Sequence, residues 1–309
     1  MRNAFAAAIT ELAAKDERIV LLSGDIGNRL FDKYRERYPA RFYNCGVAEA
    51  NMTGMAAGLA LSGLRPFTYT ITPFATTRVI EQIRVDICYH DVPVVIVGTG
   101  SGLSYASLGP THHSCEDVGI LRCFPNLTIL CPADAMEVGP AIEAALSCPG
   151  PVYIRLGKKG EPVIHEQPPR FEVGRGLVMR EGTDVCLLGM GTMTAVALDA
   201  AKLLDSQGIS ARVVSMQTVK PLDERLLAES FDRFAVVAVV EEHSVIGGLG
   251  SAVAEWLARG GPRRGVLEAI GTPDAFVSVA GSQQWMREGC GLTAAAIAER
   301  VANRSKAVR

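Results

Sequence analysis

The stretch VPVVIVG, residues 92–98, decides the fold class of this chain. Its apolar and β-branched residues follow one another without polar alternation, so both faces of the strand are expected to be buried. Strands of this kind are typical of a parallel sheet covered by helices. Similar short runs occur at 19–22, 66–70, 127–131 and 152–156, and few turn signals for antiparallel hairpins stand between them.

Helical spacing of apolar residues fills the gaps between these strands. Helices are expected near Glu49–Leu61, Ala75–Tyr89 and Asp134–Ala145. The first residues favour an amphipathic helix over a signal peptide, because Glu11 and Lys15 interrupt the apolar run. Further along the chain, the alternation of strands and helices resumes with the runs DVCLLGMG (184–191), ARVVSMQ (211–217) and AVVAVVEEH (235–243).

The sequence therefore predicts an α/β protein of two doubly wound domains, the first with a parallel sheet and the second with a mostly parallel one. We place the first domain at residues 1–160, a linker at 161–172 and the second domain at 173–309. The linker prediction rests on Pro162, Pro168 and Pro169 in a stretch with little periodicity.

Composition narrows the classes of partner. The 309 residues include 31 Lys+Arg and 33 Asp+Glu, a net charge of −2 without a basic stripe, so nucleic-acid binding is not expected. No apolar stretch approaches the roughly 20 residues of a membrane span. The 8 cysteines form no CxxC pair, and several lie in strand-like runs. They favour buried thiols in a reducing compartment, hence a cytoplasmic location.

Glycine clusters at 98–102, 189–191 and 247–250 do not have the spacing of a dinucleotide fingerprint, and no P-loop occurs. No group of His, Cys, Asp or Glu shows the spacing of metal ligands either. We therefore expect neither a nicotinamide cofactor nor a metal held by this chain alone.

Two segments bring candidate side chains to helices. In NCGVAEANMTGMAAGLA (44–60), Glu49 opens a helix, where it is either a functional carboxylate or an ordinary first-turn Glu favoured by the helix dipole. In TPFATTRVIEQIR (72–84), Phe74 and Arg78 lie four residues apart on one helical face. A core aromatic beside a solvated Arg would give the same pattern.

Two further segments lie at the ends of buried strands. GPTHHS (109–114) places His112 and His113 in a loop of the kind that carries ligand sites in α/β proteins, and histidine is the usual proton carrier near neutral pH. EEHSVIGGLG (241–250) fits either a capped strand-to-helix turn or a functional site.

Taken together with GDIG (24–27) and RCFPNLTILCPADAMEV (122–138), these segments resemble the C-terminal part of transketolase and 1-deoxyxylulose-5-phosphate synthase. Their order and spacing match over essentially the whole chain. The resemblance implies a pyrimidine-binding domain followed by a transketolase C-terminal domain, in an enzyme that uses thiamine diphosphate.

The Gly-Asp-Gly…Asn motif with which this family holds the diphosphate and its metal does not occur here. The chain is therefore expected to resemble the small subunit of a split-gene transketolase, inactive until it pairs with a large subunit. That partner would hold Mg²⁺ or another divalent ion, thiamine diphosphate would bind across the interface, and two large and two small chains would assemble.

The resemblance also implies roles around the cofactor. Glu49 would hydrogen-bond N1′ of the aminopyrimidine and favour its imino tautomer, which activates the thiazolium. Phe74 would stack on the pyrimidine ring, Arg78 and Gln82 would shape the site or the subunit contact, and Asp25 would sit near the cofactor.

For the substrate, the resemblance implies that His112 contacts donor hydroxyls and moves protons, with His113 beside it. Arg155 or Lys158 would bind a sugar phosphate, and Lys158 is the closer match.

Two departures from the family pattern concern this pocket. Leu108 stands where an Asp usually reads a sugar hydroxyl, and Gly100 stands where transketolases carry a phosphate-binding His. We therefore expect an altered substrate, such as a modified or unphosphorylated sugar.

The expected reaction is transfer of a two-carbon ketol unit from a ketose donor to an aldehyde acceptor. Three alternatives stay open: a decarboxylating synthase that uses pyruvate, a β-type subunit of a 2-oxo acid dehydrogenase, and a non-catalytic regulatory subunit that has kept the fold.

Overall fold

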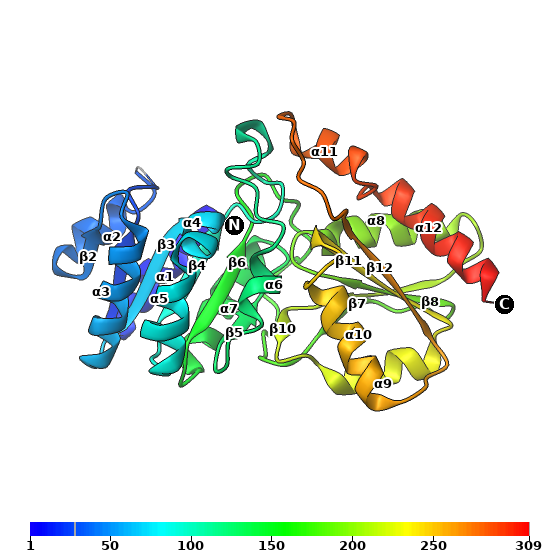
Figure 1. Ribbon diagram of the computed structural model, residues 1–309, viewed down its shortest axis with the longest axis horizontal. Coiled ribbons are helices and arrows are strands. Elements are labelled where there is room, and N and C mark those ends of the chain that lie inside the picture. The colour runs from blue at the N-terminus through cyan, green and yellow to red at the C-terminus, as the bar shows by residue number, and fades with distance from the viewer. Residues whose placement is uncertain (28, 309) are drawn as a thin grey trace.

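The computed structural model describes residues 1–27 and 29–308, and it contains two sheets flanked by helices. The first sheet and its helices occupy the blue-to-green half of Figure 1, and the second sheet lies in the half that runs to red. Both sheets are mostly parallel, which confirms the predicted α/β class.

The first sheet has seven strands in the order β10-β5-β6-β4-β3-β1-β2. All neighbouring pairs are parallel except β10 with β5. The buried strand predicted within residues 92–98 forms β4, the middle strand of the sheet, and every residue of β4 is buried. The strand bounds are β1 Ile19–Ser23, β2 Phe42–Asn44, β3 Arg65–Ile71, β4 Val95–Thr99, β5 Thr128–Leu130, β6 Val152–Leu156 and β10 Thr218–Lys220.

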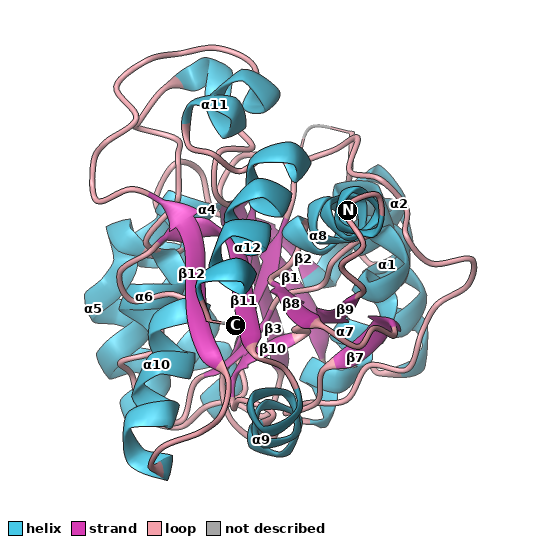
Figure 2. Cartoon of the chain, turned by 90° about the vertical axis from the view of Figure 1, so that its right-hand side faces the viewer, coloured by secondary structure: helices cyan, strands magenta, loops and turns pink. Residues whose placement is uncertain are grey.

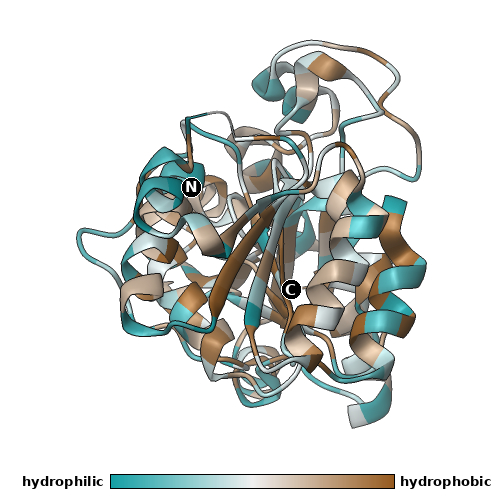
Figure 3. Ribbon diagram, turned by 90° about the vertical axis from the view of Figure 1, so that its left-hand side faces the viewer, coloured by the Kyte–Doolittle hydropathy of each residue, from teal (hydrophilic) through white to brown (hydrophobic). Residues whose placement is uncertain are grey.

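Alternate residues of these strands point into two apolar layers. Val95 and Val97 pack with Phe5 of α1 and Ile142 of α7, whereas Ile96 packs on the opposite face. Figure 3 shows apolar, brown residues in the strands and a mixture of brown and teal residues on the helices around them. The helices of this half are α1 Arg2–Lys15, α2 Asp32–Arg37, α3 Glu49–Leu61, α6 Asp117–Leu121 and α7 Ala135–Ser147, with short 3₁₀ turns η1 Pro39–Arg41 and η4 Ala106–Leu108.

The segment predicted as one helix over 75–89 is broken into four pieces: α4 Thr72–Ala75, η2 Thr77–Val79, α5 Ile80–Gln82 and the π-helical η3 Ile83–Tyr89. Thr76 lies outside the helical region of backbone space, and its hydroxyl donates to the Thr72 carbonyl oxygen at 2.8 Å. Threonine side chains compete in this way with the backbone ladder, which explains the break.

The second sheet has the order β12-β11-β8-β9-β7, and its edge strand β7 runs antiparallel to β9. Helices α8 and α12 cover one face, and α9 and α10 cover the other (Figure 2). Its elements are β7 Leu177–Arg180, β8 Val185–Gly189, α8 Met193–Asp205, β9 Ala211–Ser215, α9 Glu224–Arg233, β11 Val236–Ser244, α10 Leu249–Gly260, β12 Val266–Thr272, α11 Gln283–Gly289 and α12 Ala294–Ala307. Within the described residues, no helix is both long and apolar enough to traverse a bilayer.

The two halves of the chain share a sheet and an apolar cluster. Strand β10 comes from the C-terminal half of the chain, yet it pairs with β5 at the edge of the first sheet. One apolar cluster continues from Met52 and Ile96 to Leu188, Val214 and Phe231. The predicted domain boundaries, with the first domain ending at residue 160 and the second beginning at 173, therefore stay a prediction from the sequence.

The segment 161–172 contains no helix or strand, and its Glu161 and His165 side chains are anchored to the first half, Glu161 by an ion pair with the amino group of Met1 at 2.9 Å. His165 Nδ1 lies 3.1 Å from Asp134 Oδ2, and Asp134 also caps α7 through the backbone N–H groups of Met136 and Glu137.

Candidate active site

The predicted site residues lie at the carboxyl edge of the first sheet. Asp25 follows β1, Glu49 follows β2, Phe74 follows β3, and Lys158 follows β6. A loop of residues 100–114, which carries His112, follows β4. Because these strands are parallel, their carboxyl ends meet at the same edge, which is where open α/β sheets place ligands.

Glu49 is buried at the start of α3, with 3% of its surface exposed. Its Oε2 atom accepts a hydrogen bond from Arg78 Nη1 at 3.0 Å. The Arg78 guanidinium carbon also lies 3.9 Å from the centre of the Phe74 ring, a cation–π contact. A flat group that bears N–H therefore covers Phe74 and donates to Glu49.

A row of rings continues from this cluster. The centre of the His112 ring lies 5.2 Å from that of Phe74, edge to face at 70°, and 6.2 Å from that of Tyr105. Lys158 Nζ in turn lies 4.2 Å from the centre of the Tyr105 ring. His112 Nδ1 is 2.9 Å from the Thr111 hydroxyl. The structure thus joins Glu49 to Lys158 through consecutive contacts.

Two residues at the Lys158 end of this row, Tyr105 within it and Arg2 beside it, were not indicated by the sequence alone. Arg2, at the start of α1, has a buried Nε atom without a hydrogen-bond partner. Burial and, to a smaller extent, the positive charges of Arg2 and Lys159 lower the pKa of Lys158. Burial raises the pKa of Tyr105, against the neighbouring charge of Arg2. Arg2, Tyr105 and Lys158 therefore form a cluster with two positively charged side chains. We call it the anion cluster, after the bound anion that these charges favour.

The sequence holds only faint signals for Arg2 and Tyr105. Tyr105 is an aromatic residue in a loop of Gly and Ser, and Arg2 is one of many helical arginines. Their proximity to Lys158 depends on the packing of α1 beside β6, which no local pattern encodes.

The two departures from the family pattern have different structural meanings. Gly100 has φ +77°, and a Cβ atom there would overlap the Tyr105 ring. The space that a side chain at position 100 would occupy is therefore filled by Tyr105. Leu108, in contrast, is 50% exposed and ends the turn η4.

Asp25 and Gln82 lie at the margin of the site. Asp25 is exposed with φ +55°, and its Oδ1 accepts from Asn44 Nδ2 at 2.9 Å. Gln82 is half-buried at the end of α5. The structure places both near the carboxyl edge but outside the row of rings.

His113 points away from its neighbour His112. It is 7% exposed, its Nε2 atom has no hydrogen-bond partner, and burial lowers its pKa. It lines a cavity of 350 Å³ whose wall includes Pro110, Glu116 and Phe276. His112 therefore lies in the row of rings, whereas His113 lines this separate cavity.

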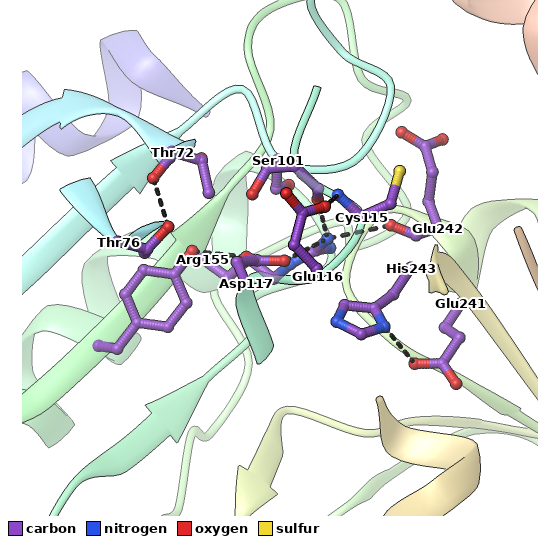
Figure 4. A network of polar contacts seen from close by, with 12 residues as sticks. Thr72, Thr76, Ser101, Cys115, Glu116, Asp117, Arg155, Glu241, Glu242 and His243 are labelled. Carbon is purple, nitrogen blue, oxygen red and sulfur yellow. Dashed lines mark hydrogen bonds and ion pairs between the residues drawn. The ribbon is translucent and has the colours of Figure 1, made fainter. Parts of the chain in front are cut away.

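Arg155, the other basic residue predicted for a sugar phosphate, lies at the junction of the two halves and not in the row of rings. It is 4% exposed, and it donates to both oxygens of buried Asp117 at 2.8 and 3.1 Å and to the Ser114 and Glu242 carbonyl oxygens (Figure 4). Strand alternation turns Arg155 toward the junction of the two halves, and its donors are used there. Of these two predicted residues, Lys158, beyond the end of β6, is the one that lies in the row of rings.

The EEH segment of β11 forms the capped turn that its sequence allowed. Glu241 accepts hydrogen bonds from the backbone N–H groups of Leu249 and Gly250 at 2.7 and 2.8 Å, at the start of α10. Glu242 points to the other side of the strand and contacts the loop of residues 100–114 through Leu103 N–H.

Among residues 1–27 and 29–308, no group of His, Cys, Asp and Glu side chains is arranged to hold a metal ion. An aminopyrimidine ring fits the residues that are present, because the Arg78 guanidinium already shows that a planar N–H donor can stack on Phe74 and reach Glu49.

Comparison with protein families agrees with this geometry. Residues 1–161 match the model for the transketolase pyrimidine-binding domain, and residues 174–297 match that for the transketolase C-terminal domain.

Individual relatives cover nearly the whole chain. The 6-deoxy-6-sulfo-D-fructose transketolase subunit SqwH of Clostridium sp. (strain MSTE9) is 40% identical over 95% of this chain and 91% of its own length. The 1-deoxy-D-xylulose-5-phosphate synthase of Chlorobium luteolum is 37% identical over 96% of this chain, which spans 47% of that protein.

Among solved structures, a split gene transketolase described as an inactive beta4 tetramer has 40% identity and a TM-score of 0.90. It aligns over 100% of this chain and 98% of its own. The sequence match, the fold and the arrangement of the carboxyl edge agree, and this chain belongs to the transketolase family.

Proposed function

We propose that this chain is the small subunit of a two-chain, thiamine-diphosphate-dependent transketolase that moves a two-carbon ketol unit from a ketose donor to an aldehyde acceptor. The observation that supports it most is the continuous row from Glu49 through Phe74, His112 and Tyr105 to Lys158. Such a row offers a cofactor-binding end, a proton carrier and an anion-binding end in one line.

Glu49 and Phe74 would hold the aminopyrimidine of the cofactor. Thiamine diphosphate, when bound, supplies an electron sink for breaking a carbon–carbon bond beside a carbonyl. Glu49 would accept a hydrogen bond from a ring N–H, in a buried place where a charge-assisted bond is stronger than in water. Arg78 would give up its place on Phe74, which it can do because its side chain is 45% exposed.

His112 would hold or move the proton of a donor hydroxyl. Its Nδ1 atom is engaged by the Thr111 hydroxyl, which leaves Nε2 as the ring atom for substrate. Histidine is the most common general acid and base in enzymes, which fits this role.

The anion cluster would bind the far end of an open-chain donor. A tetrahedral oxyanion, such as the phosphate or sulfonate in the names of the relatives above, matches the charges of Arg2 and Lys158. The expectation of an altered substrate therefore narrows to a donor whose terminal group is anionic and fits beside Tyr105.

A separate large subunit would hold the cofactor's diphosphate and its divalent metal. This partner is proposed because a close relative is named as a transketolase subunit and is matched over 91% of its length. We propose an assembly of two large and two small chains.

Reconstitution with the cognate large subunit tests the proposal. The complex should transfer ketol units, and Glu49→Gln should lower kcat by about 10²–10⁴-fold, the range for losing a proton-transfer group, at saturating cofactor. Glu143→Gln, on the exposed side of α7, is the matched control. Unchanged turnover in Glu49→Gln would instead favour a regulatory subunit.

A decarboxylating synthase is the second candidate, because a 1-deoxy-D-xylulose-5-phosphate synthase is 37% identical to this chain. The two candidates differ in the donor. Release of CO₂ from pyruvate by the reconstituted complex, with no turnover of ketose donors, would support the synthase.

A further inference from the structure

The loop of residues 100–114 carries Tyr105 and His112, so its conformation decides where the row of rings lies. Gly102 and Ser114 close its stem as an isolated antiparallel bridge, with two backbone hydrogen bonds of 2.9 Å. Inside that stem the loop has only the short 3₁₀ turn η4. Its other backbone hydrogen bonds are local turn bonds, such as those from Ala106 N–H to the Leu103 carbonyl oxygen and from His112 N–H to that of Gly109, so the orientation of the loop as a whole depends on support from its surroundings.

That support comes from the second sheet. Glu242 of β11 is 2% exposed, and its Oε1 atom accepts a hydrogen bond from the Leu103 backbone N–H at 2.7 Å. Gln283 of α11 donates to both Glu242 carboxylate oxygens, at 2.9 and 3.2 Å. Arg287 of α11 forms an ion pair with Glu242 through Nε and reaches the Thr192 hydroxyl at 3.3 Å through Nη2.

The fit between Glu242 and the loop is tight. Gly102 has φ +59°, and a Cβ atom there would lie 2.6 Å from Glu242 Oε1. Leu103 and Ala106 also pack against Met286 of α11 in a small separate apolar cluster. Both the polar and the apolar contacts therefore join the base of the loop to α11.

We propose that Glu242 and Arg287 are positioning residues: the pair holds the 100–114 loop so that His112 and Tyr105 face the donor. Arg287 neutralises the buried carboxylate, and the carboxylate fixes Leu103 at the stem. The C-terminal half of the chain would thus contribute to donor binding without touching the donor. The catalytic role of the loop rests on the proposed function. The dependence of the loop conformation on Glu242 does not.

Hydrogen exchange of the isolated full-length chain tests the structural half. In Arg287→Gln the Glu242 charge loses its only ion-pair partner among the described side chains, and the amides of Leu103 and Ser114 should exchange about tenfold faster or more. Arg287→Lys keeps the charge and should restore most of the protection. Arg263→Gln, which removes an exposed pair with Asp232 in the same half, should leave these amides unchanged.

Glu242→Gln provides a second variant, because its amide oxygen can still accept from Leu103 while the charge is gone. It should give a smaller rise in exchange than Arg287→Gln. Equal exchange of Leu103 and Ser114 in wild type and Arg287→Gln overturns the proposal. So does a rise that is equally large throughout β8, β9 and β11, since that would be a general loss of stability.

Steady-state kinetics of the reconstituted complex test the catalytic half. Arg287→Gln should lower kcat/KM for the donor by about 10- to 100-fold, as expected for a misplaced contact, while the affinity for thiamine diphosphate stays at the wild-type value. Unchanged kcat/KM despite faster loop exchange overturns the positioning role. If wild type itself shows no turnover, the proposed function fails, and the exchange result still decides whether Glu242 orders the loop.

Discussion

Two basic side chains near the end of β6 show how burial and partners decide the role of a charge. Arg155 is enclosed and paired with Asp117, and its donors are used within the protein. Lys158, three residues later, is half-buried over Tyr105 and beside Arg2, with no carboxylate recorded as its ion-pair partner in the described part of the chain. Removing Arg155 would leave the buried Asp117 carboxylate without its ion-pair partner, whereas removing Lys158 would take a positive charge from the anion-binding end proposed above.

Lys158→Met should therefore weaken binding of an anionic donor. A hydrogen bond to a charged group contributes about 1.5–3 kcal/mol, so KM for that donor should rise about 10- to 100-fold with little change in kcat. An uncharged donor should be affected much less. Lys159→Met, at the exposed neighbouring position, is the control, and an equal effect of both variants would contradict a specific role for Lys158.

The lowered pKa of Lys158 adds a pH dependence to the same site. As pH rises through that pKa, Lys158 loses its proton and the anion cluster loses charge. KM for the anionic donor should therefore increase on the alkaline side, beginning below the model-peptide range of lysine near 10.4. In Lys158→Met this alkaline rise should be absent, which a pH profile of KM would reveal.

At the scale of single elements, the loop after β4 shows how one aromatic side chain and one glycine depend on each other. Gly100 has a positive φ and lies under the Tyr105 ring, while Lys158 covers that ring. A side chain at position 100 and an aromatic ring at 105 exclude each other. In this chain the Tyr105 ring occupies the space beside position 100.

Gly100→Ala should lower the free energy of unfolding by about 1–3 kcal/mol, because it combines a strained backbone with overlap of Tyr105. In a Tyr105→Ala background the overlap disappears, so the same substitution should cost less, and the two effects should not add. Urea unfolding of the two single variants and the double variant measures this coupling. Strict additivity would contradict the overlap.

At the scale of the whole molecule, the two halves are joined by buried polar groups as well as by a continuous apolar cluster. Arg155 of β6 donates to the Glu242 carbonyl oxygen of β11 at 3.0 Å (Figure 4), and the Glu242 carboxylate accepts from the Leu103 backbone N–H at 2.7 Å. Strand β10 completes the first sheet with residues of the second half. We therefore expect the two halves to unfold together.

Burial of Glu241 at this junction predicts how stability changes with pH. Burial raises the pKa of Glu241 to about 7, against the two backbone N–H groups that it accepts at α10. Between the unfolded value near 4.3 and about 7, the folded state keeps a proton that the unfolded state has released. This contribution to stability is full below that window and falls through it, by on the order of 3 kcal/mol.

Glu241→Gln should flatten this dependence, and Glu166→Gln, at an exposed position of the 161–172 segment, should not. Unfolding midpoints between pH 4.5 and 8 provide the measurement. A wild-type stability that rises with pH across this window, with no difference in Glu241→Gln, would contradict the raised pKa.

The sequence by itself determined the α/β class, the buried strands other than β2, β7, β10 and β12, and the motifs at the carboxyl ends of the strands. Apolar runs such as 92–98 bury both faces wherever they lie, and parallel strands bring the ends of their neighbours to one edge. Glu49, Phe74 and His112 followed from that logic together with the family resemblance.

Only the tertiary structure decided which charged side chains are paired within the protein and which can bind a ligand. Arg155 and Lys158 look alike in sequence, and Arg2 is distant from both, but packing of α1 and α6 sorts them into one buried pair and one cationic cluster. The same holds for the break in the helix at Thr76 and for the contact of Glu242 with Leu103. Pairings between distant residues depend on the burial of both partners at once, which no single stretch of sequence encodes.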